Sequence, residues 1–145
     1  ASTGNGGVPI KVTNLKEIAM IGYVTLGTND LPRAKAFYDT LLAEIGVKRL
    51  MEFDGRGYAW AAAMDKPMLC IMKPYDGRPA TVGNGVMAGI GVDTRDQVDR
   101  VYKKALQLGG TDEGPPGLRA EGGDGFYVAY FRDLDGNKLD VFCYG

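Results

Sequence analysis

The feature that most constrains the fold of this chain is an order of predicted elements, one strand, one helix and three strands, that occurs twice. In the first occurrence, residues 21–28 are rich in β-branched and aromatic residues and stop at Asn29-Asp30, a turn and helix-capping signal. The apolar residues that follow have helical spacing: Ala34, Phe37, Tyr38, Leu41, Leu42 and Ile45. Gly46 ends this predicted helix, and segments 47–53, 58–63 and 68–73, separated by turn residues, predict three strands.

The second occurrence begins after residues 74–85, whose prolines and glycines predict a connection between two halves. Segment 86–93 predicts a strand, and Thr94 with Gln97 three residues later matches a capping box that starts a helix. Segments 126–132 and 138–143 predict the last two strands, so the remaining strand must lie within the glycine- and proline-rich stretch 111–124. The sequence therefore predicts a single α+β domain over residues 20–145, made of two βαβββ modules, 20–76 and 86–145.

Residues 1–19 precede this domain and differ from it, with small and polar residues and a glycine cluster before Met20. One hypothesis is that Met20 is the original start and that the upstream residues are an N-terminal extension, such as an expression tag. The alternative is that Val8, Ile10 and Val12 alternate as an edge strand, which pairs with the domain or with a second chain.

The charge balance disfavours several kinds of partner. The chain has 17 basic and 18 acidic side chains, a formal net charge of -1, and no block of like charges. We therefore expect neither nucleic acid nor an anionic membrane as a partner. No apolar run approaches the roughly 20 residues that span a bilayer, and the start of the chain lacks the features of a signal peptide. These observations predict a cytoplasmic protein in which Cys70 and Cys143 are reduced, buried thiols.

The absence of histidine excludes more chemistry than any other single property of the sequence. Ser-His-Asp and Cys-His catalysis, zinc sites of the HExxH type and histidine acid–base catalysis all need this residue. Any catalysis by this chain must therefore use carboxylates, tyrosine, lysine, arginine, thiols or the backbone.

Two segments at the ends of the predicted domain carry a family resemblance. Residues 22–46, GYVTLGTNDLPRAKAFYDTLLAEIG, and residues 126–143, FYVAYFRDLDGNKLDVFC, resemble the opening and closing segments of the glyoxalase and bleomycin resistance (vicinal oxygen chelate) superfamily. Leu134 stands where proline is usual. We interpret Asp133 to Asn137 as the hairpin turn of the closing segment and not as a calcium loop, because the distal glutamate is missing. The resemblance implies curved sheets around a shared cleft and, commonly, a homodimer.

Metal-dependent members of that family place one ligand on each of four strands. The resemblance assigns these positions here to Tyr23, to Met72 or its neighbour Ile71, to Met87 and to Asp140. One phenol, one carboxylate and two thioethers do not suit nickel, zinc, iron or manganese, which need three or four nitrogen or oxygen ligands in enzymes of this kind. We therefore expect no metal and no other cofactor.

Strand alternation predicts which side chains face the implied cleft. Counted from the four positions above, that face carries Tyr23, Thr25, Gly27, Met68, Cys70, Met72, Met87, Gly89, Gly91, Lys138, Asp140 and Phe142. The opposite face is aliphatic and predicts the core. With Trp60 added as a further aromatic residue, the predicted ligand-binding residues are Tyr23, Thr25, Trp60, Cys70, Met72, Met87, Gly89, Asp140 and Phe142.

Three functions are compatible with such a cleft. The first is metal-free binding of an aromatic or amphipathic small molecule, with Asp140 pairing with a cationic or hydrogen-bonding group of the ligand. The second is a metal-independent isomerase or lyase in which Tyr23 or Asp140, its pKa shifted by burial, moves a proton. The third is a non-catalytic module that only dimerises, with Met72 and Met87 filling a collapsed cleft.

Overall fold

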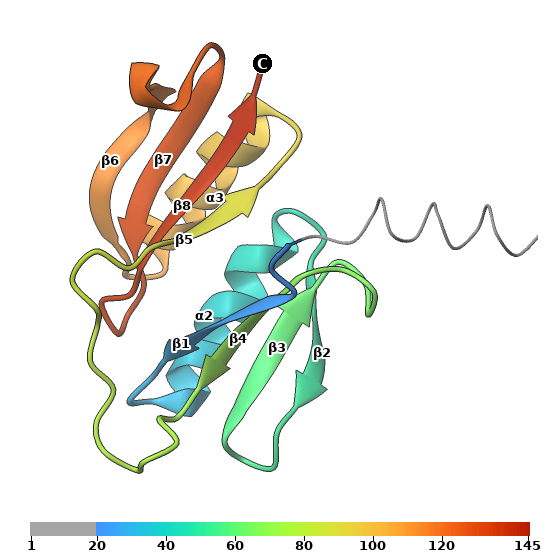
Figure 1. Cartoon of the computed structure of the whole chain (residues 1–145), viewed down its shortest axis with the longest axis vertical. Helices are drawn as coiled ribbons and strands as arrows, with labels where there is room; N and C mark the ends of the chain where they lie inside the picture. Colours follow the sequence, from blue (N-terminus) through green and yellow to red (C-terminus); the bar gives the residue numbers. More distant parts are fainter. Residues whose placement is uncertain (1–19) are drawn as a thin grey trace, which may run out of the picture.

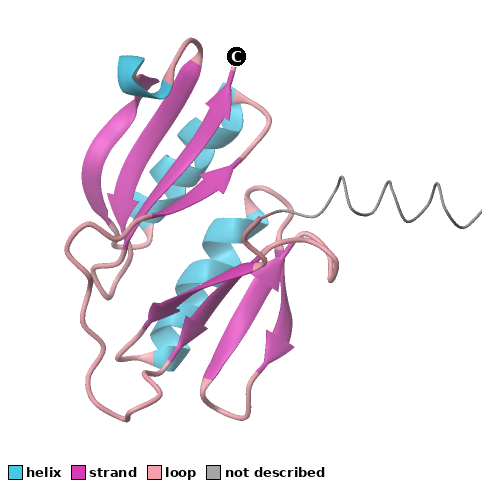
Figure 2. Cartoon of the chain, viewed as in Figure 1, coloured by secondary structure: helices cyan, strands magenta, loops and turns pink. Residues whose placement is uncertain are grey.

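The computed structural model describes residues 20–145, which form two four-stranded sheets, each with its own helix (Figures 1 and 2). The elements of the first module are β1 (Tyr23–Gly27), α2 (Leu31–Ala43), β2 (Lys48–Glu52), β3 (Gly57–Ala61) and β4 (Met68–Met72). Those of the second module are β5 (Ala88–Gly91), α3 (Arg95–Gln107), β6 (Thr111–Leu118), the short 3-10 helix η1 (Ala120–Gly122), β7 (Phe126–Arg132) and β8 (Lys138–Tyr144). Both hypotheses about residues 1–19 fall outside the described residues.

The two sheets have the same topology. Their strand orders are β1-β4-β3-β2 and β5-β8-β7-β6. In each sheet the first and last strands of the module pair in parallel, and the other neighbours pair in antiparallel fashion. The helix after the first strand provides the crossover that a parallel pair requires. The predicted α+β fold of two βαβββ modules is therefore confirmed.

Local sequence signals explain where both helices begin. Asp30 Oδ1 accepts a hydrogen bond from the backbone N of Arg33 at 3.1 Å, and Thr94 with Gln97 forms the predicted capping box. The sequence predicts a strand somewhere within 111–124, and β6 lies there although it contains Pro115 and Pro116. β6 is an edge strand whose register against β7 shifts at these prolines, so the ladder does not need their missing N–H groups.

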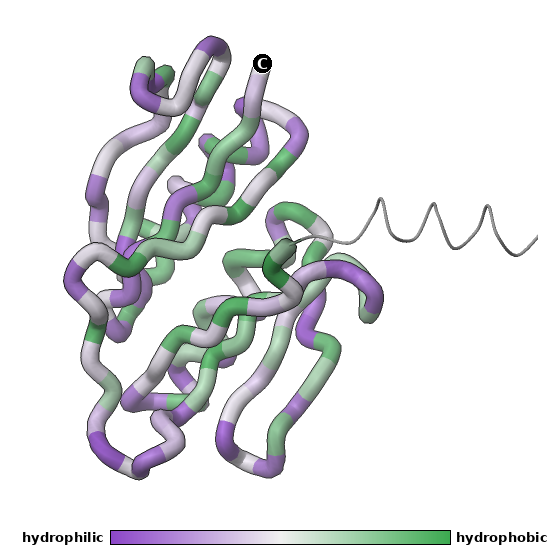
Figure 3. Tube along the Cα trace, in the orientation of Figure 1, coloured by the Kyte–Doolittle hydropathy of each residue, from purple (hydrophilic) through white to green (hydrophobic). Residues whose placement is uncertain are grey.

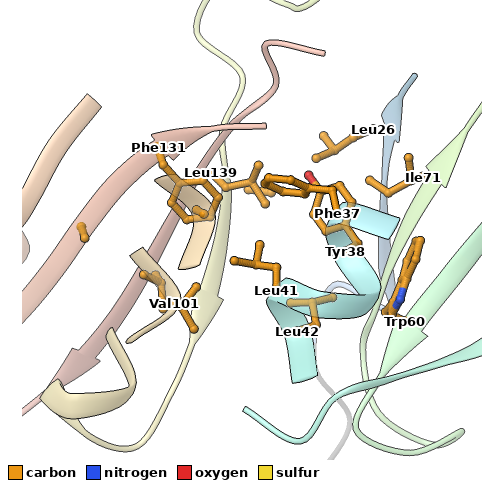
Figure 4. Close-up of a cluster of buried hydrophobic side chains, with 14 of the residues drawn as sticks. Leu26, Phe37, Tyr38, Leu41, Leu42, Trp60, Ile71, Val101, Phe131 and Leu139 are labelled. Atoms are coloured by element: carbon orange, nitrogen blue, oxygen red, sulfur yellow. The ribbon is translucent and has the colours of Figure 1, made fainter. Parts of the chain in front are cut away.

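One hydrophobic cluster joins the two modules. In Figure 4, Phe37 and Leu41 of α2 point toward Phe131 of β7 and Leu139 of β8, and all four side chains are buried. Val101 of α3 belongs to the same cluster. Because the apolar stripe of α2 is covered partly by the other module, the two modules cannot separate without exposing core residues to water.

Polar contacts at the turn between β7 and β8 reinforce this join. The hydroxyl of Tyr38 donates to Asp133 Oδ2 at 2.6 Å, and Asn137 Nδ2 donates to the carbonyl of Gly27 at 2.8 Å. Thr28 Oγ1 donates to Asp135 Oδ2 at 2.6 Å. The aspartates of this turn thus accept hydrogen bonds from the first module, which agrees with a structural turn and not with a calcium loop.

Two further observations bear on the sequence predictions. Cys70 and Cys143 are both buried and free. Among residues 20–145, no helix is long and apolar enough to cross a membrane.

Candidate functional site

A pocket of about 760 Å³ lies on the face of the first sheet that the helix does not cover. Ligand pockets for small molecules have volumes of this order and mostly apolar walls. The lining residues come from β1, β2, β4, the β2–β3 turn and the connection between the modules: Tyr23, Thr25, Gly27, Met51, Phe53, Arg56, Met68, Cys70, Met72, Lys73, Pro74, Tyr75, Asp76, Pro79, Ala80 and Thr81.

The floor of the pocket follows from strand alternation. β1 and β4 pair in parallel so that Thr25 lies opposite Cys70 and Gly27 opposite Met72, and the side chains of one parity face the pocket. Gly57 in β3 leaves room for Met72, because a Cβ at that position would collide with the Met72 sulfur and with the carbonyl of Ile71. The floor is therefore made of small and soft apolar groups.

The connection between the modules forms one wall of the pocket. Asn29 holds it in place by two hydrogen bonds. Asn29 Nδ2 donates to the carbonyl of Ala80 at 3.0 Å, and the backbone N of Ala80 donates to Asn29 Oδ1 at 2.6 Å. Ala80 also packs closely on Gly27, where an added Cβ would lie 2.9 Å from the Ala80 Cβ. The segment that the sequence predicted only as a linker is therefore part of the site.

The second sheet has a different open face, centred on Asp140. This side chain is only 5% exposed, and its Oδ1 has no hydrogen-bond partner among residues 20–145. Gly89 in β5 makes room for it, since a Cβ there would lie 3.0 Å from Asp140 Oδ1. Burial raises the pKa of Asp140 to about 6, although the neighbouring Lys138 acts in the opposite direction. Tyr130 pairs with Asp140 across the sheet, and burial and the Asp140 charge raise the pKa of its hydroxyl.

Aromatic rings extend this second face. Phe126, Phe142 and Tyr144 lie in mutual contact, with ring centroids between 5.4 Å and 6.2 Å apart. Phe142 also lies over Gly91 and Gly89, at distances of 3.5 Å and 3.4 Å from the Cβ atoms that those glycines lack. Sequence reasoning missed Tyr130, Phe126 and Tyr144, although the alternation of β7 contained the signal for the first two.

The structure divides the predicted site residues between the two faces. Tyr23, Thr25, Cys70 and Met72 line the pocket of the first sheet. Gly89, Asp140 and Phe142 lie together on the second sheet, and Met87 precedes β5 with 45% of its surface exposed. The lining of the first-sheet pocket does not include Met87, Gly89, Asp140 or Phe142.

The assignment of Trp60 to the cleft is wrong. Trp60 is 1% exposed, belongs to the hydrophobic core and donates from Nε1 to Asp39 Oδ1 at 2.9 Å. The reason is strand alternation in β3: Gly57 approaches Met72 on the pocket face, so Trp60, three residues later, points to the opposite face, toward α2.

The pairing registers also revise one position implied by the family resemblance. Tyr23 and Met87 stand at the same spacing before the helix caps Asp30 and Thr94, which makes them equivalent in the two modules. In the registers, Thr25 lies opposite Cys70, and its equivalent Gly89 lies opposite Asp140. Cys70, and not Met72, is therefore the counterpart of Asp140.

The residues at these positions do not fit the divalent metal that metal-dependent relatives use. They are a phenol, a thiol, a thioether and a carboxylate, which together supply too few nitrogen or oxygen ligands for such a metal. Burial raises the pKa of the Cys70 thiol, with the hydrogen bond to Thr25 lowering it in part, so the group is a neutral thiol in the protein as described. Within residues 20–145, no three Cys, Asp or Glu side chains gather as a metal site would require.

Other residues of the pocket were missed by sequence reasoning. Met51 lies in β2 and Phe53 directly follows it, whereas Arg56 and Tyr75 come from a turn and from the connection between modules. Alternation along β2 could have suggested Met51 and Phe53. No periodic signal marks Arg56 or Tyr75, because turn residues have no fixed face.

Comparisons with known proteins agree with the fold. The family model described as "Glyoxalase/Bleomycin resistance protein/Dioxygenase superfamily" matches residues 20–141. A glyoxalase/bleomycin resistance protein from Albidiferax ferrireducens is 34% identical, with a TM-score of 0.77 over 88% of this chain and 100% of that one.

More distant structures share the fold alone. A glyoxalase/bleomycin resistance protein/dioxygenase family enzyme from Burkholderia phytofirmans is 18% identical, with a TM-score of 0.67 over 88% of this chain and 100% of that one. A lactoylglutathione lyase from Agrobacterium tumefaciens is 21% identical, with a TM-score of 0.61 over 87% of this chain and 94% of that one. No match was found among curated protein sequences. On the family model and the 34% identical relative together, this chain belongs to the glyoxalase/bleomycin resistance protein/dioxygenase superfamily.

Proposed function

We propose that this protein binds an aromatic or amphipathic small molecule in the pocket of the first sheet, without a metal. The observation that carries the proposal is the pocket itself, about 760 Å³ in volume, with a floor of methionine, cysteine and threonine side chains and Tyr23 at its edge. Soft thioethers adapt to irregular apolar ligands, and aromatic side chains offer large contact areas. An open pocket of this size favours ligand binding over the alternative of a collapsed cleft that serves only dimerisation.

A neutral fluorescent probe, phenylnaphthylamine, tests this proposal. We expect a saturable rise in fluorescence with a stoichiometry of one probe per chain. Thr25→Trp fills the pocket from an exposed position on β1 and should weaken binding roughly tenfold or more. Thr111→Trp is the matched control, because Thr111 is also exposed on a strand but lies outside the pocket. Equal binding by both variants and the wild type would refute the pocket as the binding site.

A second candidate function, metal-independent proton transfer, is supported by Asp140. Its carboxyl group is buried, lacks a hydrogen-bond partner at Oδ1 among the described residues and has a pKa raised to about 6. A desolvated carboxylate is a stronger base than one in water, as acid–base catalysis requires. Tyr23 is the weaker candidate, because it is 68% exposed and lies on the other sheet.

Nitrobenzisoxazole tests for such a base without knowledge of the natural substrate. A carboxylate removes its ring proton while the N–O bond breaks, which yields a coloured phenolate. We expect a rate above that of buffer in the wild type and a loss of the excess in Asp140→Asn. If the excess persists in that variant, Asp140 is not the base, and ligand binding remains the better proposal.

We also propose that two copies of the chain associate. Apolar side chains on the second module are exposed in the single chain, namely Val86, Met87, Leu118 and Tyr144. Exposed apolar side chains of this kind are available for a contact between two copies of the chain. Light scattering coupled to size-exclusion chromatography measures the mass directly, and a monomer at high micromolar concentration would contradict this proposal.

A further inference from the structure

We propose that the ligand of the first-sheet pocket carries an anionic group, held at the pocket mouth by Arg56 and Lys73. This inference rests on the proposed binding function and names the chemical class of the ligand: an apolar body with a carboxylate, sulfonate or phosphate at one end. It differs from the expectation of a cationic partner for Asp140, because Asp140 does not line the pocket.

The backbone places the two cationic residues at the same end of the pocket. Arg56 belongs to the tight turn between β2 and β3, and Lys73 directly follows β4. The backbone N of Lys73 donates a hydrogen bond to the carbonyl of Arg56 at 2.7 Å, so the backbones of the two residues lie side by side. Figure 3 shows hydrophilic segments at this end of the first module, in the β2–β3 turn and at the start of the connection. Both residues line the pocket.

Neither cation is neutralised by the protein within residues 20–145. Arg49, Arg100 and Arg132 all have carboxylate partners within 4.0 Å, whereas Arg56 and Lys73 form no salt bridge among the described residues. The guanidinium of Arg56 lies 5.3 Å from the ring centroid of Tyr75. Stacking on an aromatic ring orients a guanidinium and leaves its N–H donors free for a ligand.

The remaining charges at the mouth favour an anion. Asp76 is the one carboxylate among the pocket-lining residues, and its Oδ1 already accepts a hydrogen bond from the backbone N of Arg78 at 2.9 Å. The pocket lining therefore carries two cationic side chains and one carboxylate. The lining also includes apolar side chains, among them Met51, Phe53 and Met68. A pocket that combines two cationic groups with apolar surface suits an amphipathic anion.

Two probes with the same ring system separate charge from apolar binding: phenylnaphthylamine, which is neutral, and anilinonaphthalene sulfonate, which is an anion. We expect the double variant Arg56→Gln/Lys73→Gln to weaken binding of the sulfonate about tenfold, because charge-assisted hydrogen bonds are lost. Binding of the neutral probe should stay within about twofold, because the apolar floor is intact. Added salt should weaken the sulfonate and not the neutral probe.

Lys103→Gln is the control for a change in net charge, because Lys103 is exposed on α3, away from the pocket. This variant should bind both probes as tightly as the wild type does. Competition by decanoate and by decyl phosphate, with decanol as the neutral reference, then distinguishes a carboxylate ligand from a phosphate ligand.

The outcomes separate this inference from the proposed function. If both probes bind and the double variant changes neither, the pocket is a binding site but anion recognition is refuted. If a cationic amphiphile, decyltrimethylammonium, displaces the neutral probe better than decanoate does, the inference is also refuted. If neither probe binds to the wild type in a Thr25-sensitive manner, the proposed function itself fails.

Discussion

The two modules share one topology but present unlike open faces. The first sheet has a pocket with methionine and cysteine side chains, closed on one side by the connection between modules. The face of the second sheet combines a buried carboxylate with three aromatic rings in contact. The equivalent positions Cys70 and Asp140 illustrate the difference, because both are buried but only one carries charge.

The two faces differ in chemistry although the fold of the modules is repeated. On the first face, a neutral thiol and thioethers provide an apolar surface on which a ligand can be held. On the second face, a carboxylate is buried with no partner for its Oδ1 among the described residues, and such costly burial is often associated with function. The modules nevertheless share a core and a polar turn, so a substitution that destabilises one module should also destabilise the other.

The largest loss of stability is expected from a substitution that removes the polar contacts between the two modules. Asp133→Ala removes the acceptor for Tyr38 and for the backbone N of Asn137, and leaves the buried Tyr38 hydroxyl without a partner. We expect a loss of about 3 kcal/mol or more in the free energy of unfolding. Asp99→Ala is the matched control, because Asp99 accepts from the Tyr127 hydroxyl at the surface, and it should cost less than about 1 kcal/mol. Urea denaturation measures both, and equal losses would contradict the proposed role of the turn.

The next prediction compares Asp140 with its counterpart Cys70 in how each affects the pH dependence of stability. The folded-state pKa of Asp140, about 6, lies above its ordinary value of 3.8. Between these values the folded protein holds a proton that the unfolded chain has released, so stability falls as pH rises through this window. Asp140→Asn should therefore stabilise the protein by about 1–3 kcal/mol at pH near 7.5 and by much less near pH 4.

Denaturation of the wild type and of Asp140→Asn at the two pH values checks this prediction. Cys70→Ser serves as the control on the first sheet, because it replaces the counterpart residue without removing a charge. It should show no comparable dependence on pH between 4 and 7.5, since a thiol is neutral throughout that range. A destabilising effect of Asp140→Asn at both pH values would mean that the carboxylate makes a favourable contact.

The substitution with the smallest expected effect concerns the wall of the first-sheet pocket. Asn29→Ala removes two hydrogen bonds to Ala80 and should cost about 1 kcal/mol, because the site is partly exposed to water. Binding of phenylnaphthylamine should weaken by roughly threefold to tenfold, since the wall is no longer held against Gly27. Thr94→Ala, at the cap of the other helix, should cost a similar amount of stability but leave probe binding unchanged.

Several parts of the site were predictable from the sequence. Strand alternation placed Tyr23, Thr25, Cys70 and Met72 on one face, because β1 and β4 are regular strands with a strict period of two. Trp60 was misplaced because it was added for its aromatic character and not counted along β3. Arg56 and Tyr75 were missed because they belong to a turn and a connection, where no period applies.

The sequence by itself determined the repeated order of elements, both helix caps and the parity of the strands. These depend on local backbone preferences and on the alternation of apolar residues, which act between near neighbours in the chain. Only the tertiary structure decided that the pocket is lined by the first module and the connection, that the connection is a wall and that Asp140 is buried without a partner at Oδ1 among residues 20–145. Each of these depends on contacts between residues far apart in sequence, whose geometry follows from how the modules pack and not from any local pattern.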